Sequence, residues 1–134
     1  MNDMNQKIIE EFRGNHGKVG GWFENSPVLL LTTTGAKSGR PFTTPVMYLA
    51  DGDRTLIFAS KAGAPGHPDW YFNLVANPTV TLEVGDEKFP AKATVITGAE
   101  RDELYARQVA LYPQFGEYEQ KTTRKIPVVA LTRA

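Results

Sequence analysis

The sequence predicts an α+β fold in which a small antiparallel sheet closes into a barrel with a few helices beside it. About six segments have strand patterns and about three have helical patterns, and the strand segments cluster instead of alternating with helices. The sequence Asp51-Gly52-Asp53 is typical of a hairpin turn, which requires antiparallel pairing. These observations disfavour a doubly wound parallel sheet. The 134 residues fit one domain over 1–134, in which 1–26 form an N-terminal helix and a glycine-rich lead-in.

The first element is expected to be an amphipathic helix from Met4 to Arg13. Met4, Ile8 and Phe12 recur at every fourth position and form one apolar stripe. The opposite face is not strongly basic, which favours packing against the protein's own sheet over a membrane surface. A glycine-rich stretch at residues 14–21 ends the helix.

Three strands are expected next. The aliphatic run in residues 28–34 predicts a strand that is buried on both faces near its start. A turn at residues 35–39 leads to a second strand over residues 43–50, and the hairpin leads to a third over residues 55–60. Pro68 then suits the first turn of a second helix.

The second helix runs through Val75 and stops at Asn77-Pro78. Alternating residues predict strands over 79–84 and 88–96. Thr97 and Glu100 have the spacing of a capping box, which opens a third helix ending at about Leu111. The aromatic segment at residues 113–124 is expected to be irregular or weakly helical, and residues 126–132 form the last strand.

The composition excludes several classes of function. Lys+Arg and Asp+Glu both number 15, so the net charge of zero argues against a nucleic-acid partner. The absence of cysteine excludes thiolate metal sites, and His16 and His67 lack any further ligand pattern, so no metal site is expected. No apolar run is long enough for a transmembrane segment. We expect a cytoplasmic protein, with membrane association through the first helix left open.

Residues 35–40, Gly-Ala-Lys-Ser-Gly-Arg, combine two glycines, two cations and a hydroxyl at the end of a strand. The glycines permit a turn with converging backbone N–H groups. Lys37, Ser38 and Arg40 would add charge and hydrogen bonds around a phosphate. A solvated basic turn explains the same residues equally well.

Small residues at positions 59–63, at the end of the third strand, would let a planar ring approach the backbone, with Lys61 neutralising an anion. A plain strand end with a solvent-facing lysine is the alternative. Trp70 is either the wall of a cofactor pocket or a core residue.

Tyr112, Phe115 and Tyr118 are spaced so that they share one face of a helical turn. That face is either core or a lid over a flat apolar substrate. Pro113 and Gly116 interrupt a long helix and favour the lid.

In this order, these stretches resemble the deazaflavin-dependent nitroreductase and quinone reductase family, whose members bind coenzyme F420. Each motif is weak alone, but the ordered set spans nearly the whole chain. The resembling segments are Phe12-Arg13 with the following glycines, residues 29–40, 44–48, 51–53, 59–61, 68–71, Asn73-Leu74, Asn77-Pro78 and Ile126-Pro127.

The resemblance implies a split β-barrel of the flavin-reductase type and three groups of site residues. The phosphate and acidic tail of the coenzyme would be held by Lys37, Ser38 and Arg40. The deazaflavin ring would be surrounded by Pro45, Met47, Ala59, Ser60, Lys61 and Trp70. The acceptor would meet Tyr48, Ser60, Tyr112 and Tyr118. Two departures are Ala36, where many relatives have a basic residue, and Phe115, within a tyrosine-rich stretch.

The function expected from the resemblance is hydride transfer from reduced coenzyme F420 to an organic acceptor such as a quinone, a nitro compound or an enone. Two alternatives are an FMN-binding split-barrel oxidoreductase and a non-catalytic deazaflavin carrier. The expected partner is the small-molecule acceptor. A homodimer is permitted by the neutral charge and an unpaired barrel edge, but not required.

Overall fold

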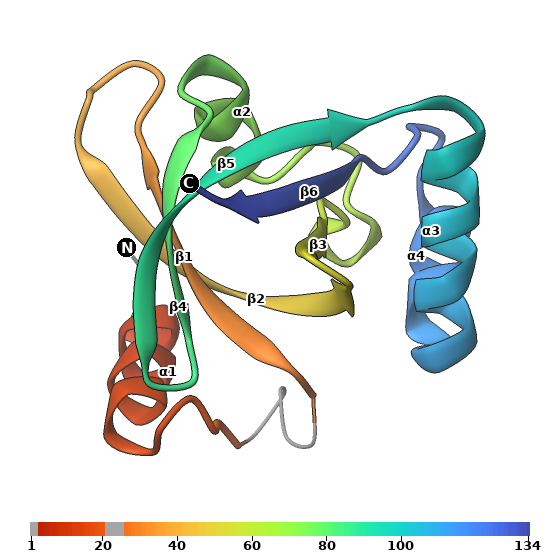
Figure 1. The fold of residues 1–134 in the computed structure, drawn as a ribbon. Helices are drawn as coiled ribbons and strands as arrows, with labels where there is room; N and C mark the ends of the chain where they lie inside the picture. Colours follow the sequence, from red (N-terminus) through yellow and green to blue (C-terminus); the bar gives the residue numbers. More distant parts are fainter. Residues whose placement is uncertain (1–2, 21–25) are drawn as a thin grey trace.

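The computed structural model describes residues 3–20 and 26–134. Its strands are β1 (Val28–Thr34), β2 (Pro41–Asp51), β3 (Arg54–Phe58), β4 (Thr79–Val84), β5 (Glu87–Ile96) and β6 (Val128–Arg133). They form one closed barrel in the order β1-β2-β3-β6-β5-β4, which Figure 1 shows from the side. Every neighbouring pair is antiparallel. The predicted α+β barrel and its antiparallel hairpin are confirmed.

The helices lie outside the barrel or at its ends (Figure 1). They are α1 (Asp3–Gly14), the single 3₁₀ turn η2 (Lys61–Gly63), α2 (Asp69–Ala76), α3 (Gly98–Leu111) and α4 (Gln114–Lys121). α3 and α4 stand beside each other on one flank of the barrel, and α1 lies at the far side, next to the β4–β5 hairpin. The Arg13 guanidinium ties α1 to β4 by donating to both carboxylate oxygens of Glu83, at 3.0 and 2.9 Å.

Side-chain alternation along the strands divides the core into an inner and an outer part. Leu29, Leu31 and Ile57 belong to the cluster inside the barrel, onto which α2 packs Trp70 and Leu74. The alternate residues of β3 and β6 point outward and are covered by α3 and α4. This outer cluster comprises Leu56, Phe58, Leu104, Tyr105, Phe115, Tyr118, Ile126, Val128 and Ala130.

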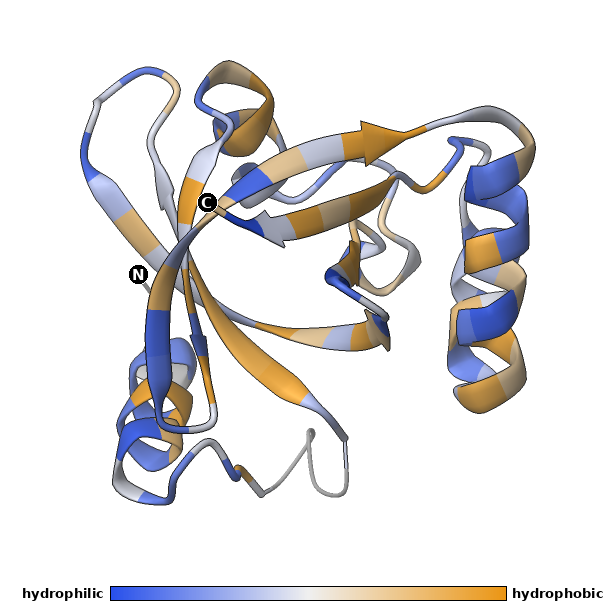
Figure 2. Ribbon diagram, viewed as in Figure 1, coloured by the Kyte–Doolittle hydropathy of each residue, from blue (hydrophilic) through white to orange (hydrophobic). Residues whose placement is uncertain are grey.

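β1 is buried on both faces near its start, as its aliphatic run predicts, and it is hydrophobic throughout that part in Figure 2. The inward residues join the inner cluster, while Val28 and Leu30 are covered by Ile9 and Phe12 of α1. Ile9 and Phe12 of α1 therefore pack against the barrel, which confirms the reading favoured by the weakly basic polar face of this helix. No helix in the described ranges is long and apolar enough to cross a membrane.

One local expectation was partly right and another was wrong. Residues 114–121, expected to be irregular or weakly helical, form the helix α4, in which Phe115 and Tyr118 are buried in the outer cluster with residues of α3. The capping box at the start of α3 does not form. Thr97 makes no side-chain cap hydrogen bond, and Glu100 instead lies 3.4 Å from the Arg54 guanidinium at the β2–β3 hairpin.

Candidate functional site

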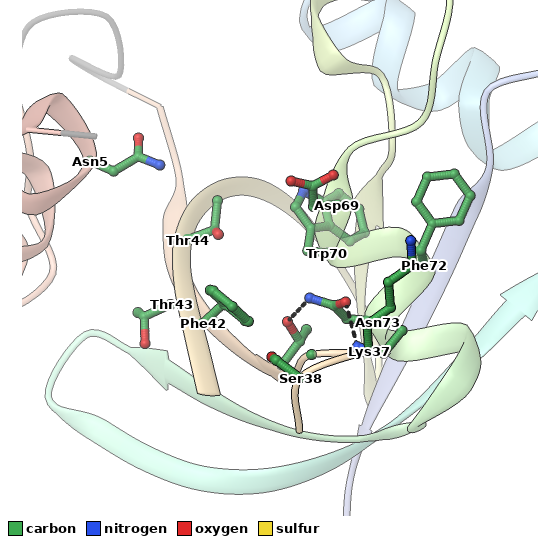
Figure 3. A pocket seen from close by; sticks show the side chains of 13 residues that line it. Asn5, Lys37, Ser38, Phe42, Thr43, Thr44, Asp69, Trp70, Phe72 and Asn73 are labelled. Carbon is green, nitrogen blue, oxygen red and sulfur yellow. Dashed lines mark hydrogen bonds between the residues drawn. The ribbon is translucent and has the colours of Figure 1, made fainter. Parts of the chain in front are cut away.

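Two adjoining cavities lie along β2 and the start of α2. The first, of about 810 Å³, is lined at one end by the turn residues Ala36, Lys37 and Ser38. The second, of about 600 Å³, lies between the middle of β2, the loop after β3 and α4. Figure 3 shows the first cavity, with Phe42 and Thr44 of β2 opposite Asp69 and Trp70 of α2. The two cavities share the wall residues Asn5, Thr44, Asp69 and Trp70.

The 35–40 turn is closed by its own backbone. The Gly35 amide donates to the Arg40 carbonyl at 2.7 Å, and the Gly39 amide donates to the Gly35 carbonyl at 3.0 Å. A side chain at position 35 would displace its neighbours, because a Cβ there would lie 2.5 Å from the Ser38 Oγ and 2.8 Å from the Phe42 ring. The turn is thus compact, and its residues 36–38 reach the first cavity.

α2 fixes this turn through an asparagine that sequence reasoning gave no role. The Asn73 Oδ1 accepts a hydrogen bond from the Ala36 amide at 3.0 Å, and its Nδ2 donates to the Thr33 Oγ1 at 3.1 Å, as drawn in Figure 3. The Asn77 Nδ2 donates to the Thr34 carbonyl at 3.4 Å. The sequence did contain one signal for this role: Asn73 is a polar, weakly helix-forming residue within a short predicted helix.

The predicted phosphate-binding residues occupy different places in the turn. Lys37 and Ser38 line the first cavity, whereas Arg40 lines neither cavity, and its backbone closes the turn. The Ser38 Oγ accepts a hydrogen bond from the Arg40 amide at 3.2 Å. Within the described part of the chain, Lys37 and Arg40 make no ion pair, so both charges remain available to an anion.

Most of the residues predicted around a ring line the second cavity. They are Pro45, Met47, Ser60, Lys61 and Trp70. Ala59 does not reach it, because this residue is fully buried in the inner cluster. Trp70 is only 8% exposed and belongs to the inner cluster, and it also lines both cavities. It is therefore both a core residue and part of the cavity wall.

The predicted acceptor-side residues separate into two pairs. Ser60 and Tyr118 line the second cavity. Tyr48 packs on the inner cluster and Tyr112 on the outer cluster, and neither lines either of these two cavities. Phe115 also lines the second cavity, next to Tyr118, with ring centroids 5.1 Å apart.

Tyr118 keeps its proton firmly. Burial, with a smaller contribution from Glu117, raises the pKa of its hydroxyl above the usual value. A neutral phenol at the cavity wall is a hydrogen-bond donor at every physiological pH.

Sequence reasoning did not predict that the η2 turn lies directly against α4. A Cβ at Gly63 would be 2.9 Å from the Tyr118 carbonyl oxygen.

Sequence reasoning also missed Arg124, which holds the loop between β3 and α2. Its guanidinium donates to the carbonyls of Ala59, Ser60 and Ala64 and lies 2.9 Å from the His67 Nδ1. The other histidine, His16, is far from this loop in the sequence, and its Nδ1 lies 2.7 Å from the Asp86 carboxylate. Among the residues described, no cluster of His, Asp or Glu side chains could hold a metal ion.

The two cavities together match an elongated ligand with an anionic group at one end. The 35–40 turn brings the Lys37 side chain and the Ser38 hydroxyl to the first cavity. The second cavity is surrounded by proline, methionine and aromatic side chains. Thr44 and Trp70 belong to both walls, so the two cavities lie directly next to each other.

Comparison with known proteins identifies the family of this chain. The family model described as F420H(2)-dependent quinone reductase matches residues 5–133. A protein of Mycobacterium tuberculosis named F420H(2)-dependent quinone reductase is 42% identical over 128 residues, which cover 91% of this chain and 85% of that protein. A solved F420-H2 dependent reductase, FDR-A, is 43% identical with a TM-score of 0.71, over 78% of this chain and 93% of that one.

A second solved structure, described as a domain-swapped dimer, is 38% identical with a TM-score of 0.73 and covers 96% of this chain and 94% of that one. The family match extends over both cavities, the 35–40 turn and all six strands. The chain therefore belongs to the F420H(2)-dependent quinone reductase family.

Proposed function

We propose that this protein is an F420H2-dependent oxidoreductase that reduces a quinone or a similar flat organic acceptor. The single observation that carries the proposal is the shared wall of the two cavities, formed by Asn5, Thr44, Asp69 and Trp70. Because the two cavities adjoin there, we infer that the coenzyme places its anionic end at the 35–40 turn and its ring in the second cavity.

The residues present fit such a coenzyme. Gly35 keeps the turn compact beside the Ser38 hydroxyl and the Phe42 ring, and Lys37, which makes no ion pair within the described residues, lines the first cavity together with Ser38. These groups would bind the phosphate and acidic tail. Two cations in the turn, Lys37 and Arg40, exceed what one phosphate needs, which favours the longer anionic tail of F420 over FMN.

The remaining residues would orient the ring and exclude water. When bound, the reduced deazaflavin supplies a hydride equivalent, so the protein contributes position and electrostatics. Trp70, Met47 and Pro45 offer apolar contact to a ring in the second cavity. Ser60 and Tyr118 would donate hydrogen bonds to the acceptor oxygen on which negative charge develops.

The test is a fluorescence titration of the purified protein with coenzyme F420 and, separately, with FMN. Turnover is then measured with reduced F420 and a panel of a quinone, a nitroaromatic compound and an enone. We expect tighter binding of F420 and reduction of the quinone. Equal or tighter binding of FMN would favour the flavin alternative. Tight F420 binding without turnover of any acceptor would favour a coenzyme carrier.

A homodimer is a further part of the proposal, supported by the relative described as a domain-swapped dimer. Light scattering after gel filtration tests it directly, because a monomer has a mass of 14.8 kDa and a dimer twice that mass.

A further inference from the structure

The loop between β3 and α2 has a backbone shape that its own sequence does not favour. Lys61 and Ala62 both have left-handed backbones, with φ of 47° and 52°. Side chains with a Cβ rarely adopt this conformation, and it persists where surrounding contacts determine it. Within the loop, the Gly63 amide donates to the Ser60 carbonyl at 2.9 Å and the Ala64 amide to the Lys61 carbonyl at 3.0 Å.

A single guanidinium holds this loop from both ends. On the side before the left-handed residues, the Arg124 Nη1 donates to the Ala59 carbonyl at 3.0 Å and Nη2 to the Ser60 carbonyl at 2.7 Å. On the other side, Nε donates to the Ala64 carbonyl at 3.0 Å. Nη1 also lies 2.9 Å from the His67 Nδ1, where the arginine is the donor.

These contacts distinguish Arg124 from an ordinary ion-paired arginine. In the described ranges Arg124 forms no salt bridge with a carboxylate. Its guanidinium N–H groups donate instead to main-chain carbonyl oxygens and to one imidazole nitrogen. Its position is intermediate between buried and exposed. A lysine ammonium is a point charge and cannot span carbonyls on both sides of the turn.

The residues held in this way are part of the second cavity. Ser60, Lys61 and Ala62 all line it, opposite Met47 and Pro45 of β2. The shape of that wall depends on the left-handed pair, because an extended or helical backbone at Lys61 and Ala62 would redirect both side chains.

We propose that Arg124 is a positioning residue for the coenzyme site: it holds the loop of residues 59–64 in the conformation that forms one wall of the second cavity. The inference rests on the proposed function in that this cavity receives the ring. Arg124 itself lines neither cavity and acts through the loop backbone.

Arg101 provides a matched control. It is a buried arginine whose guanidinium also donates to the main chain: Nε and Nη2 donate to the Ile126 carbonyl at 3.0 and 2.8 Å. It anchors the same C-terminal segment but makes no hydrogen bond to residues 59–64. Arg101→Lys therefore reports the loss of a buried arginine without disturbing the loop directly.

The experiment compares the wild type, Arg124→Lys, Arg101→Lys and the double variant Arg124→Lys with Ala62→Gly. Circular dichroism verifies folding, and amide hydrogen exchange at Gly63 and Ala64 is measured in the coenzyme-free protein by NMR. Arg124→Lys is expected to speed exchange at these two amides about tenfold, because the loop opens more often. Arg101→Lys should leave that exchange within about twofold of the wild type. Unchanged exchange in Arg124→Lys would overturn the inference.

Coenzyme affinity is then measured for the same four proteins by titration with F420. Arg124→Lys should weaken binding about tenfold, and Arg101→Lys should change it less than about twofold. Ala62→Gly in the Arg124→Lys background should recover part of the loss, because glycine adopts the left-handed backbone freely.

Equal losses in the two lysine variants, or no recovery with glycine, would mean that Arg124 acts only on general stability. Failure of the wild type to bind F420 would count against the proposed function. The exchange measurement would still decide whether Arg124 holds the loop.

Discussion

Lys37 and Arg40 are both cations of one short turn, yet the fold gives them different tasks. Lys37 lines the first cavity, and Arg40 supplies the backbone groups that close the turn. Two residues that look equivalent in the sequence are therefore not equivalent toward a bound anion.

We expect Lys37→Ala to weaken F420 binding about ten- to a hundredfold, the loss that follows from removing a charge-assisted hydrogen bond of about 1.5–3 kcal/mol. The melting temperature should remain close to that of the wild type, because the side chain is exposed. Titrations at low and high salt measure both effects, since salt weakens the contribution of an exposed charge. Lys88→Ala, an exposed lysine on β5, is the control. An unchanged dissociation constant at low salt would identify the turn as a plain solvated one.

Tyr118 combines a structural ring with a hydroxyl at the wall of the second cavity. Tyr118→Phe should preserve folding and F420 affinity while slowing quinone turnover about tenfold, because the donor to the acceptor oxygen is lost. Tyr118→Ala should instead lower the free energy of unfolding by about 3–5 kcal/mol. Steady-state kinetics and urea unfolding separate the two effects. Full turnover in the phenylalanine variant would limit Tyr118 to packing.

At the scale of elements, α4 and the η2 turn form one wall and depend on each other. Gly63 has φ of 81°, and a Cβ there would lie 2.9 Å from both the Tyr118 carbonyl oxygen and the Lys121 Cβ. The two elements therefore approach each other backbone to backbone. Through this contact, Lys61 and Ala62 of η2 and Tyr118 of α4 form adjoining parts of the wall of the second cavity.

Gly63→Ala should destabilise the protein by about 2–3 kcal/mol, because it combines an unfavourable left-handed backbone with a steric clash. Gly66→Ala, in the same loop, is the matched control: its Cβ would meet nothing within 4 Å and its backbone is not left-handed. That variant should be neutral or slightly more stable. Urea unfolding of both variants checks the prediction, which equal free energies of unfolding would contradict.

At the scale of the whole molecule, one histidine links stability to pH. The His67 ring lies next to the Tyr71 ring, with centroids 4.7 Å apart and the planes tilted by 47°, and its Nδ1 lies 2.9 Å from the Arg124 Nη1. Burial, and to a smaller extent Arg124, lowers the pKa of His67 below its usual 6.5. The unfolded chain then binds a proton more readily than the folded protein.

The contribution of His67 to stability is therefore complete above about pH 6.5 and is lost as the pH falls from there toward the lowered pKa. Urea unfolding between pH 7.5 and pH 5 should show a steeper loss for the wild type than for His67→Gln. Glutamine keeps an acceptor for Arg124 but has no proton to bind. Parallel pH profiles would show that His67 is not linked to folding.

The sequence by itself determined the barrel and much of the site's inventory. Alternation in residues 79–84, the Asp51-Gly52-Asp53 hairpin and the aliphatic start of β1 are local patterns, and each predicted its element. The residues of the 35–40 turn and Trp70 were recognised for the same reason, because glycine spacing and aromatic side chains are visible without a fold. Resemblance of the ordered motifs to one family supplied the coenzyme.

Only the tertiary structure decided the remainder, which depends on contacts between segments distant in the sequence. α4 is helical because Phe115 and Tyr118 find a buried surface on α3. Glu100 pairs with Arg54 rather than capping its helix. Tyr48 and Tyr112 face apolar clusters, whereas Tyr118 reaches the cavity. Arg124 meets the carbonyls of a loop some sixty residues away. Local sequence patterns contain no information about such partners, because only the folding of the whole chain brings these segments together.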